Sequence, residues 1–82
     1  MFKKDDENYI YYIFGNNLKK QRKLKGMTQE QLSNQSTYAL SFIRNIESKK
    51  VHQTVSLGTI YNFAKVLGIP VSKLFEELEE DK

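Results

Sequence analysis

Apolar residues recur along this chain at intervals of three and four, the spacing that places them on one face of an α-helix. The aromatic run 9–14 favours a strand by composition alone, because aromatic and β-branched side chains fit a pleated surface. The helical spacing nevertheless continues past that run, through Ile10, Ile13, Phe14, Leu18 and Leu24. The pattern therefore predicts one helix over about Tyr9–Lys25, with Gly15 as a weak point inside it and Gly26 as its stop signal.

Four further segments show the helical spacing, and most of them carry a start signal. Thr28 and Gln31 can form a capping box before the second helix, Ser56 can cap the fourth, and Pro70 fits the first turn of the last. The fourth helix carries a continuous apolar stripe, Leu57, Ile60, Phe63, Ala64 and Leu67. The predicted ranges are about 29–35, 40–48, 57–67 and 71–80. Five helices without a strand predict an all-α fold, a compact five-helix bundle.

The third predicted helix has two unlike sides. Phe42, Ile43 and Ile46 share the side that can pack against a core. The other side carries residues whose identity core packing does not dictate, namely Leu40, Ser41, Arg44, Asn45 and Ser48. Since a tight break at 36–39 joins this helix to the one before it, the pair predicts a helix-turn-helix, an arrangement that places a helix in a DNA groove.

Composition narrows the chemistry that the chain can carry. Its 82 residues suffice for one domain. Without cysteine there is no thiolate nucleophile, no cysteine-based zinc site and no disulfide, and a single histidine leaves no catalytic set or metal-ligand cluster to assemble. We therefore expect neither an enzyme nor a metal, a cofactor or a small-molecule ligand. The sequence has no long apolar run and no signal-peptide pattern, so we expect no membrane partner and a cytoplasmic location.

Charge is unevenly distributed along the sequence. Between Gly15 and Val55 eight basic residues face two acidic ones, a formal charge of about +6, whereas acidic residues prevail from Val71 onward. A basic middle segment suits a polyanion, because lysine and arginine displace the counterions condensed on phosphates. The plainer alternative is that these charges are solvated helix faces.

Several spaced motifs agree in order and register with one known family. They are Gly15-x-x-Leu18-Lys19-x-x-Arg22-x-x-Lys25-Gly26-Met27-Thr28-Gln29-Glu30-Gln31-Leu32, Phe42-Ile43-x-x-Ile46-Glu47, Ala64-Lys65-x-Leu67-Gly68-Ile69 and Leu74-Phe75. Over about residues 14–76 the chain resembles the Cro and phage-repressor (XRE) helix-turn-helix family. The resemblance implies a five-helix, lambda-repressor-like domain, which we assign to residues 9–80, with helices 2 and 3 as the helix-turn-helix. Residues 1–8 are polar and charged, which predicts a flexible segment before this domain. The resemblance further implies a transcriptional regulator, such as a repressor, that binds double-stranded DNA as a homodimer on a palindromic operator.

The resemblance also assigns roles to individual residues. The positions that face bases are Leu40, Ser41, Arg44 and Asn45. The positions that contact phosphates are Lys19, Thr28, Gln29, Ala39, Ser48, Lys49 and Lys50. Arg44 is the strongest candidate for reading a base, since a guanidinium can pair with guanine O6 and N7, and its alternatives are a phosphate contact or a surface ion pair. Leu40 occupies a position that is often polar in the family. Either it packs on a thymine methyl group, or the third helix is rotated so that this position turns away from the bases.

Arg22 and Glu47 correspond to a family pair that bridges the first helix to the end of the recognition helix. We expect an ion pair of architectural importance, the alternative being two exposed charges that contribute almost nothing. Two departures from the family concern the turn, because Thr37 replaces the turn glycine and Ala39 replaces the small polar cap. The turn is therefore expected to be wider, or to be capped by Thr37 or Ser36.

A dimer is expected because a domain of this size cannot bury all of its apolar surface. The favoured interface is the last helix, with Val71, Leu74, Phe75 and Leu78, and the runner-up is the aromatic segment 9–14. One alternative function uses the same fold. An antitoxin would bind a toxin through the acidic helix near residues 75–81 and would bind DNA to control its own operon.

Overall fold

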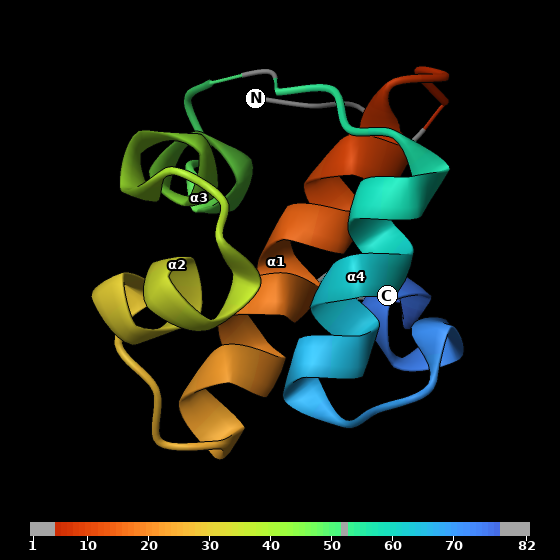
Figure 1. Ribbon diagram of the computed structural model, residues 1–82. Coiled ribbons are helices and arrows are strands. Elements are labelled where there is room, and N and C mark those ends of the chain that lie inside the picture. The colour runs from red at the N-terminus through yellow and green to blue at the C-terminus, as the bar shows by residue number, and fades with distance from the viewer. Residues whose placement is uncertain (1–4, 52, 78–82) are drawn as a thin grey trace.

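The computed structural model describes residues 5–51 and 53–77 of the chain. Within these ranges it holds four α-helices and no strand, so the all-helical prediction is confirmed. The helices are α1 (Tyr9–Leu24), α2 (Gln29–Ser36), α3 (Leu40–Glu47) and α4 (Leu57–Leu67), followed by a 3₁₀ helix, η1 (Val71–Phe75). Figure 1 shows α1 running through the middle of the molecule, with α2 and α3 on one side of it and α4 and the C-terminal segment on the other.

Local signals set most of the helix boundaries. The Thr28 hydroxyl accepts a bond from the Gln31 N–H at 3.0 Å, and the Gln31 side-chain oxygen accepts one from the Thr28 N–H at 2.8 Å. This pair is the expected capping box of α2, and the Ser56 hydroxyl caps α4 as expected. Gly26 and Gly68 adopt the left-handed conformation beyond the ends of α1 and α4, at φ of +70° and +67°.

Every element contributes to one apolar core. Leu32 of α2, Ile43 of α3 and Phe63 of α4 are fully buried, at 0% exposure. The rings of Phe14 and Phe63 lie with their centroids 6.3 Å apart, which joins α1 to α4. The remaining core residues are Leu18, Ile46, Ile60, Ala64, Leu67 and Leu74. Since each fully buried Leu, Ile or Phe contributes about 1.5–3 kcal/mol, this core supplies the dominant driving force for folding.

The expected fifth helix is wrong in its type and extent. Residues Val71–Phe75 form a 3₁₀ helix, and Glu76 is extended at φ −67° and ψ 140°. The buried Asn17 side chain on α1 donates from Nδ2 to the carbonyl oxygens of Glu76 at 2.8 Å and of Leu74 at 3.4 Å. These bonds hold the end of η1 and the extended Glu76 against α1.

Two expectations fall partly outside the described ranges. Leu78, expected at a dimer interface, is one such residue, and residues 1–4 of the expected flexible segment are others. The described part of that segment, residues 5–8, forms a turn before α1. In it the Asp6 side chain accepts a bond from the Asn8 N–H at 2.8 Å.

Three residues assigned to the apolar pattern are exposed instead. Leu24 is 69% exposed, Leu57 is 84% exposed and Ile10 is 44% exposed. Leu24 is the last residue of α1 and Leu57 is the first residue of α4, where neighbouring elements no longer cover the helix. Helical spacing gives the face on which a residue lies and does not reveal where the covering elements end.

Helices α1 and α3 make a close approach at Gly15. A Cβ atom at this position would overlap the carbonyl oxygen of Ile46 on α3. Helix α1 runs unbroken through Gly15, as the sequence predicts. The absence of a side chain is what lets the two helices pack against each other.

We expect Gly15→Ala to lower the free energy of unfolding by about 1–3 kcal/mol, the usual cost of overfilling a packed interior. The matched control is Gly58→Ala in α4, where a Cβ would meet only the Ser56 hydroxyl, at 3.8 Å. Because alanine has the higher helix propensity, the control is expected to be neutral or slightly stabilising. Urea denaturation measures both variants, and equal stabilities would contradict the close packing at Gly15.

Candidate nucleic-acid interface

The candidate site is formed by α2, α3 and the turn between them. Residues 37–39 make the turn. Ile43 and Ile46 anchor α3 in the core, at 0% and 5% exposure. Phe42 is half-buried and contacts Tyr38 of the turn, with ring centroids 5.6 Å apart. These contacts hold one side of α3 against the molecule and leave the other side open.

The turn contains a left-handed residue, the conformation that glycine usually supplies, although no glycine is present. Thr37 itself takes the left-handed conformation, at φ +66°, which costs a residue with a side chain roughly 1–2 kcal/mol. Two hydroxyl groups stabilise the turn: Ser33 donates to the Tyr38 carbonyl oxygen at 2.6 Å, and Ser36 accepts from the Tyr38 N–H at 3.3 Å. The expected capping of α3 by Thr37 or Ser36 is wrong, because α3 has no side-chain cap and the Ser36 hydroxyl bonds to Tyr38, which lies before the helix.

Tyr38 ties the turn to α4, a role that the sequence interpretation missed. Its hydroxyl accepts a bond from Asn62 Nδ2 at 3.0 Å, and its ring centroid lies 5.0 Å from that of Phe63. The bond from Asn62, and then one with Thr59, lower the pKa of Tyr38 below its usual value, while burial acts in the opposite direction. The sequence signal that could have found this residue is a large aromatic side chain among the small residues of the turn.

The outer side of α3 brings together the residues expected to face bases. Ser41 and Arg44 are exposed, and Leu40 and Asn45 are half-buried beside them. Ala39 precedes the helix without a side-chain cap. Within the described part of the chain, no hydrogen bond or ion pair engages the side chains of Ser41, Arg44 or Asn45. Helix α3 therefore presents an unengaged hydroxyl, guanidinium and amide to solvent.

The residues expected to contact phosphates are spread over several elements. Lys19 lies on α1, Thr28 and Gln29 begin α2, Ala39 precedes α3, and Ser48, Lys49 and Lys50 follow it. The three lysines are exposed. The Ser48 hydroxyl accepts a bond from the Lys50 N–H at 3.1 Å, so it is engaged within the chain. The start of α2 lies beside the end of α3, because Gln29 contacts Glu47.

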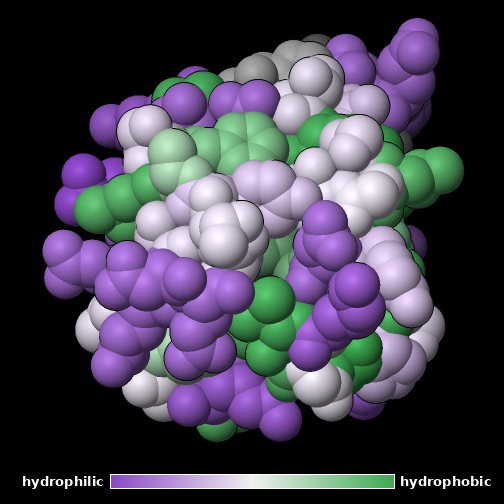
Figure 2. Space-filling view, viewed as in Figure 1, coloured by the Kyte–Doolittle hydropathy of each residue, from purple (hydrophilic) through white to green (hydrophobic). Residues whose placement is uncertain are grey.

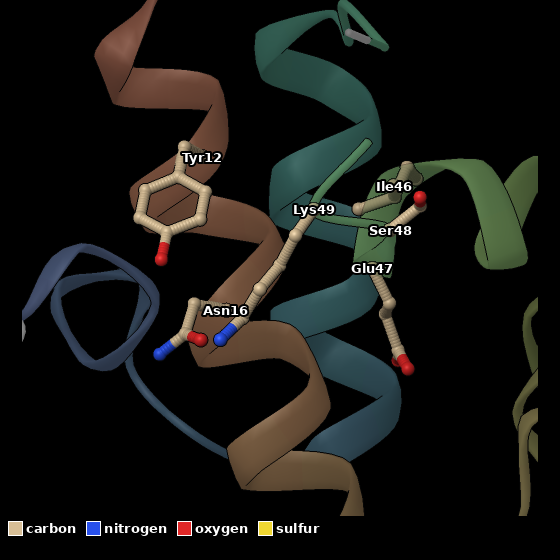
Figure 3. Close-up of a pocket in the computed structure, with 6 residues that line it drawn as sticks. All are labelled: Tyr12, Asn16, Ile46, Glu47, Ser48 and Lys49. Carbon is tan, nitrogen blue, oxygen red and sulfur yellow. The ribbon is translucent and has the colours of Figure 1, made fainter. Parts of the chain in front are cut away.

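A small notch lies where α1 meets the end of α3 (Figure 3). Its volume of about 10 Å³ has room for one water molecule and for no larger ligand. Figure 3 shows the Lys49 side chain running along the notch toward Asn16 of α1, while Glu47 points the other way. In the free protein Lys49 is thus directed at α1 and not along the outer side of α3.

The expected ion pair between Arg22 and Glu47 is present and buried. Arg22 donates from Nε to Glu47 Oε2 at 2.9 Å and from Nη2 to Oε1 at 2.8 Å, with side chains 7% and 2% exposed. The remaining nitrogen, Nη1, donates to the Met27 carbonyl oxygen at 2.7 Å. Hydrogen bonding to Glu47 raises the pKa of Arg22 against the opposing effect of burial. Gln29 Nε2 also donates to Glu47 Oε1, at 3.0 Å, so one carboxylate joins three helices.

The surface over α2 is polar. Hydrophilic side chains gather over α2 on the face that Figure 2 shows. The exposed residues of this helix include Glu30, Gln31, Asn34 and Gln35. In residues 5–51 and 53–77 no group of three or more His, Cys, Asp or Glu side chains could hold a metal ion. Nor is any helix of these ranges long and apolar enough to span a membrane.

Comparisons with known proteins agree with this geometry. A model of a helix-turn-helix family matches residues 18–74. The restriction-modification controller protein C.AhdI from Aeromonas hydrophila has a crystal structure with 32% sequence identity and a TM-score of 0.71, over 79% of this chain and 96% of that protein. A hypothetical transcription factor, NHTF from Neisseria, has 23% identity and a TM-score of 0.78, over 99% of this chain and 91% of that protein, and shares the fold. A search of curated proteins finds no match.

We expect Arg22→Ala to lower the free energy of unfolding by about 3–5 kcal/mol, because it leaves the Glu47 carboxylate buried without its counter-charge. Lys20→Ala is the matched control, since it removes a basic residue of the same helix whose ion pair with Glu76 is exposed and 3.9 Å long. Such an exposed pair contributes about 0–1 kcal/mol. Thermal unfolding followed by circular dichroism compares the two, and an Arg22→Ala melting temperature equal to the parent's would refute the structural role of the pair.

Proposed function

This chain belongs to the helix-turn-helix family of DNA-binding transcription regulators, and from that premise we propose that it binds a palindromic operator as a homodimer, with α3 in the major groove. The observation that carries the proposal is the open outer side of α3, whose polar side chains no other described group engages. Its inner side is fixed in the core by Ile43 and Ile46. Free polar groups on a firmly held helix are what the reading of base edges requires.

Each outer residue of α3 suits a base edge. Arg44 has the donors to pair with O6 and N7 of guanine, the commonest specific contact in the major groove. Asn45 can pair with N6 and N7 of adenine, and Ser41 can donate or accept with little discrimination. Leu40, half-buried at the start of α3, suits a thymine methyl group. We assign the base contacts to these four residues.

Phosphate contacts are assigned to the elements around α3. The proposed residues are Lys19, Thr28, Gln29, Ala39, Ser48, Lys49 and Lys50. Thr28 and Gln29 stand at the positive end of the α2 dipole, which favours an anion. Ala39 can offer only its backbone N–H. Lys49 is exposed, and its side chain runs along the notch toward Asn16 (Figure 3).

The similarity to a restriction-modification controller supports one kind of regulator. That similarity covers 96% of the controller protein, at 32% identity. We assign this chain a controller-like role in which operator occupancy follows its own concentration, through coupled dimerisation and DNA binding. The antitoxin alternative has no observation in its favour, because neither similar structure is described as an antitoxin and the acidic stretch that would bind a toxin lies mostly outside the described residues.

A second copy is proposed to dock on an apolar groove between the N-terminal half of α1, the start of α4 and η1. The groove has a volume of about 190 Å³ and is lined by Ile10, Tyr11, Phe14, Val55, Leu57, Ile60 and Phe75. Leu57 stands at the edge of this groove and is 84% exposed. In a two-fold dimer, Leu57 of each copy could enter the groove of the other, so the surface is self-complementary. Among the residues expected at the interface, Phe75 lines this groove and Val71 is exposed. Leu74 is buried in the core, so its side chain has no surface left for a partner.

Arg44→Ala is expected to abolish the base preference at one position of each half-site and to weaken binding by about 1–3 kcal/mol. Selection of binding sites from random duplexes, followed by anisotropy titration with the selected duplex, measures both. Lys65→Ala removes a positive charge from the exposed surface of α4 and, as the matched control, should leave the base preference intact. Direct readout is contradicted if the preference survives Arg44→Ala, and a parent without any preference would reduce the function to nonspecific association.

Leu57→Gln is expected to raise the dimer dissociation constant about tenfold or more, since a buried leucine contributes about 1.5–3 kcal/mol and a two-fold interface contains it twice. Leu24→Gln is the matched control, because Leu24 is also exposed but lies at the end of α1 that is remote from the start of α4 (Figure 1). Analytical ultracentrifugation reports both constants. The homodimer would be ruled out by a parent chain that stays monomeric at concentrations that saturate the selected DNA.

A further inference from the structure

Glu47 has a contact that its ion pair with Arg22 does not require. Gln29 Nε2 donates to Glu47 Oε1 at 3.0 Å, across 18 residues of sequence. Gln29 is the first residue of α2 and is half-buried, whereas Glu47 is the last residue of α3. The contact therefore joins the start of one helix of the helix-turn-helix to the end of the other.

The carboxylate determines which way the Gln29 amide faces. An ionised carboxylate accepts hydrogen bonds and cannot donate them, so only the Nε2 side of the amide can lie against it. Nε2 carries two hydrogens, and the bond to Glu47 uses one of them. Within the described part of the chain, no acceptor takes the other. The amide thus keeps one N–H of fixed direction at the start of α2.

Arg22 neutralises the Glu47 carboxylate, which lies beside the proposed phosphate contact of Gln29. An unpaired carboxylate close to DNA would repel a phosphate. The Arg22 guanidinium binds Glu47 through two hydrogen bonds, at 2.9 and 2.8 Å, and neutralises its charge. The two residues are 6% and 9% exposed, so water competes little for the carboxylate. What remains available is the second Nε2–H of Gln29, which no described group accepts.

We propose that Glu47 is a positioning residue for DNA binding, which holds the Gln29 amide so that its second N–H is aimed at a backbone phosphate. The inference rests on the proposed function, in which Gln29 contacts a phosphate. A donor that is already ordered in the free protein loses less side-chain freedom when it binds. The contact also keeps the phosphate anchor on α2 in a fixed relation to the base-reading side of α3.

A double-mutant cycle tests this link. The proteins are the parent, Gln29→Ala, Glu47→Gln and the double variant, and anisotropy titration at one salt concentration gives each dissociation constant for the selected duplex. Gln29→Ala is expected to weaken binding about tenfold, the effect of losing a hydrogen bond to a charged group. Glu47→Gln is expected to weaken binding by a similar factor, because a glutamine there can donate and let the Gln29 amide turn over. In the Gln29→Ala background the same change is expected to cost no more than about twofold, the usual error of additivity.

Gln31→Ala is the matched control for the cycle. Gln31 lies in the same helical turn as Gln29 but bonds to Thr28 and not to Glu47. Its effect is expected to multiply with that of Glu47→Gln. Circular dichroism at the assay temperature shows whether each variant is folded, and Glu47→Asp replaces Glu47→Gln if the latter does not fold, since it keeps the charge but withdraws it from Gln29.

The side-chain amide resonances of Gln29 give a second readout that needs no DNA. In the parent, the two Nε2 protons are expected to differ widely in chemical shift, because one is bonded to a carboxylate, and Glu47→Gln is expected to reduce that difference. Coupling confined to Gln29 and Glu47 supports the inference. Fold-changes that multiply in the Gln29→Ala, Glu47→Gln double variant overturn it and leave the proposed function in place. A parent that binds none of the selected duplexes overturns the proposed function, and this inference with it.

Discussion

The buried carboxylate of Glu47 is the constraint on which the placement of the helices depends. A buried charge is costly unless it is paired and hydrogen-bonded, and its three bonds come from Arg22 on α1 and Gln29 on α2. Arg22 also holds the Met27 carbonyl oxygen in the loop between those helices. These bonds can form together only for one relative placement of α1, α2 and α3. The apolar core supplies the driving force, and this polar network selects the arrangement, in which no buried side-chain nitrogen or oxygen of the described residues lacks a partner.

As a result, helix α3 is held at both ends. At its C-terminal end the Ile46 carbonyl packs against Gly15, next to the carboxylate network. At its N-terminal end Thr37 closes the turn in a left-handed conformation, and Tyr38 is bonded to Asn62 of α4. Because α3 is already ordered in the folded chain, the proposed contacts of its outer side chains with bases would cost less conformational entropy. The strain at Thr37 is tolerated because contacts on either side determine the conformation of the turn.

Features that depend on neighbours in sequence could be predicted, and features that depend on distant residues could not. The caps at Thr28 and Ser56 and the four α-helices follow from local signals, and the outer residues of α3 follow from helical periodicity. The partner of Arg22 lies 25 residues away and was identified only through the family resemblance. The position of the 3₁₀ helix η1 could not be foreseen, because the side chain that holds its end is Asn17, more than fifty residues earlier on α1. The solvent exposure of Leu57 was equally out of reach, since it depends on where the covering elements end in space.

The most direct measurement is a titration of the isotope-labelled protein with the selected duplex, followed through backbone and side-chain chemical shifts. If α3 reads the major groove and α2 anchors on the backbone, the largest changes will fall on Gln29, Ser41 and Arg44, while Tyr61 and Lys65 on the exposed surface of α4 stay unchanged. Changes concentrated on α4 or on the apolar groove, with the outer side of α3 unmoved, would contradict the assignment of α3 as the recognition helix.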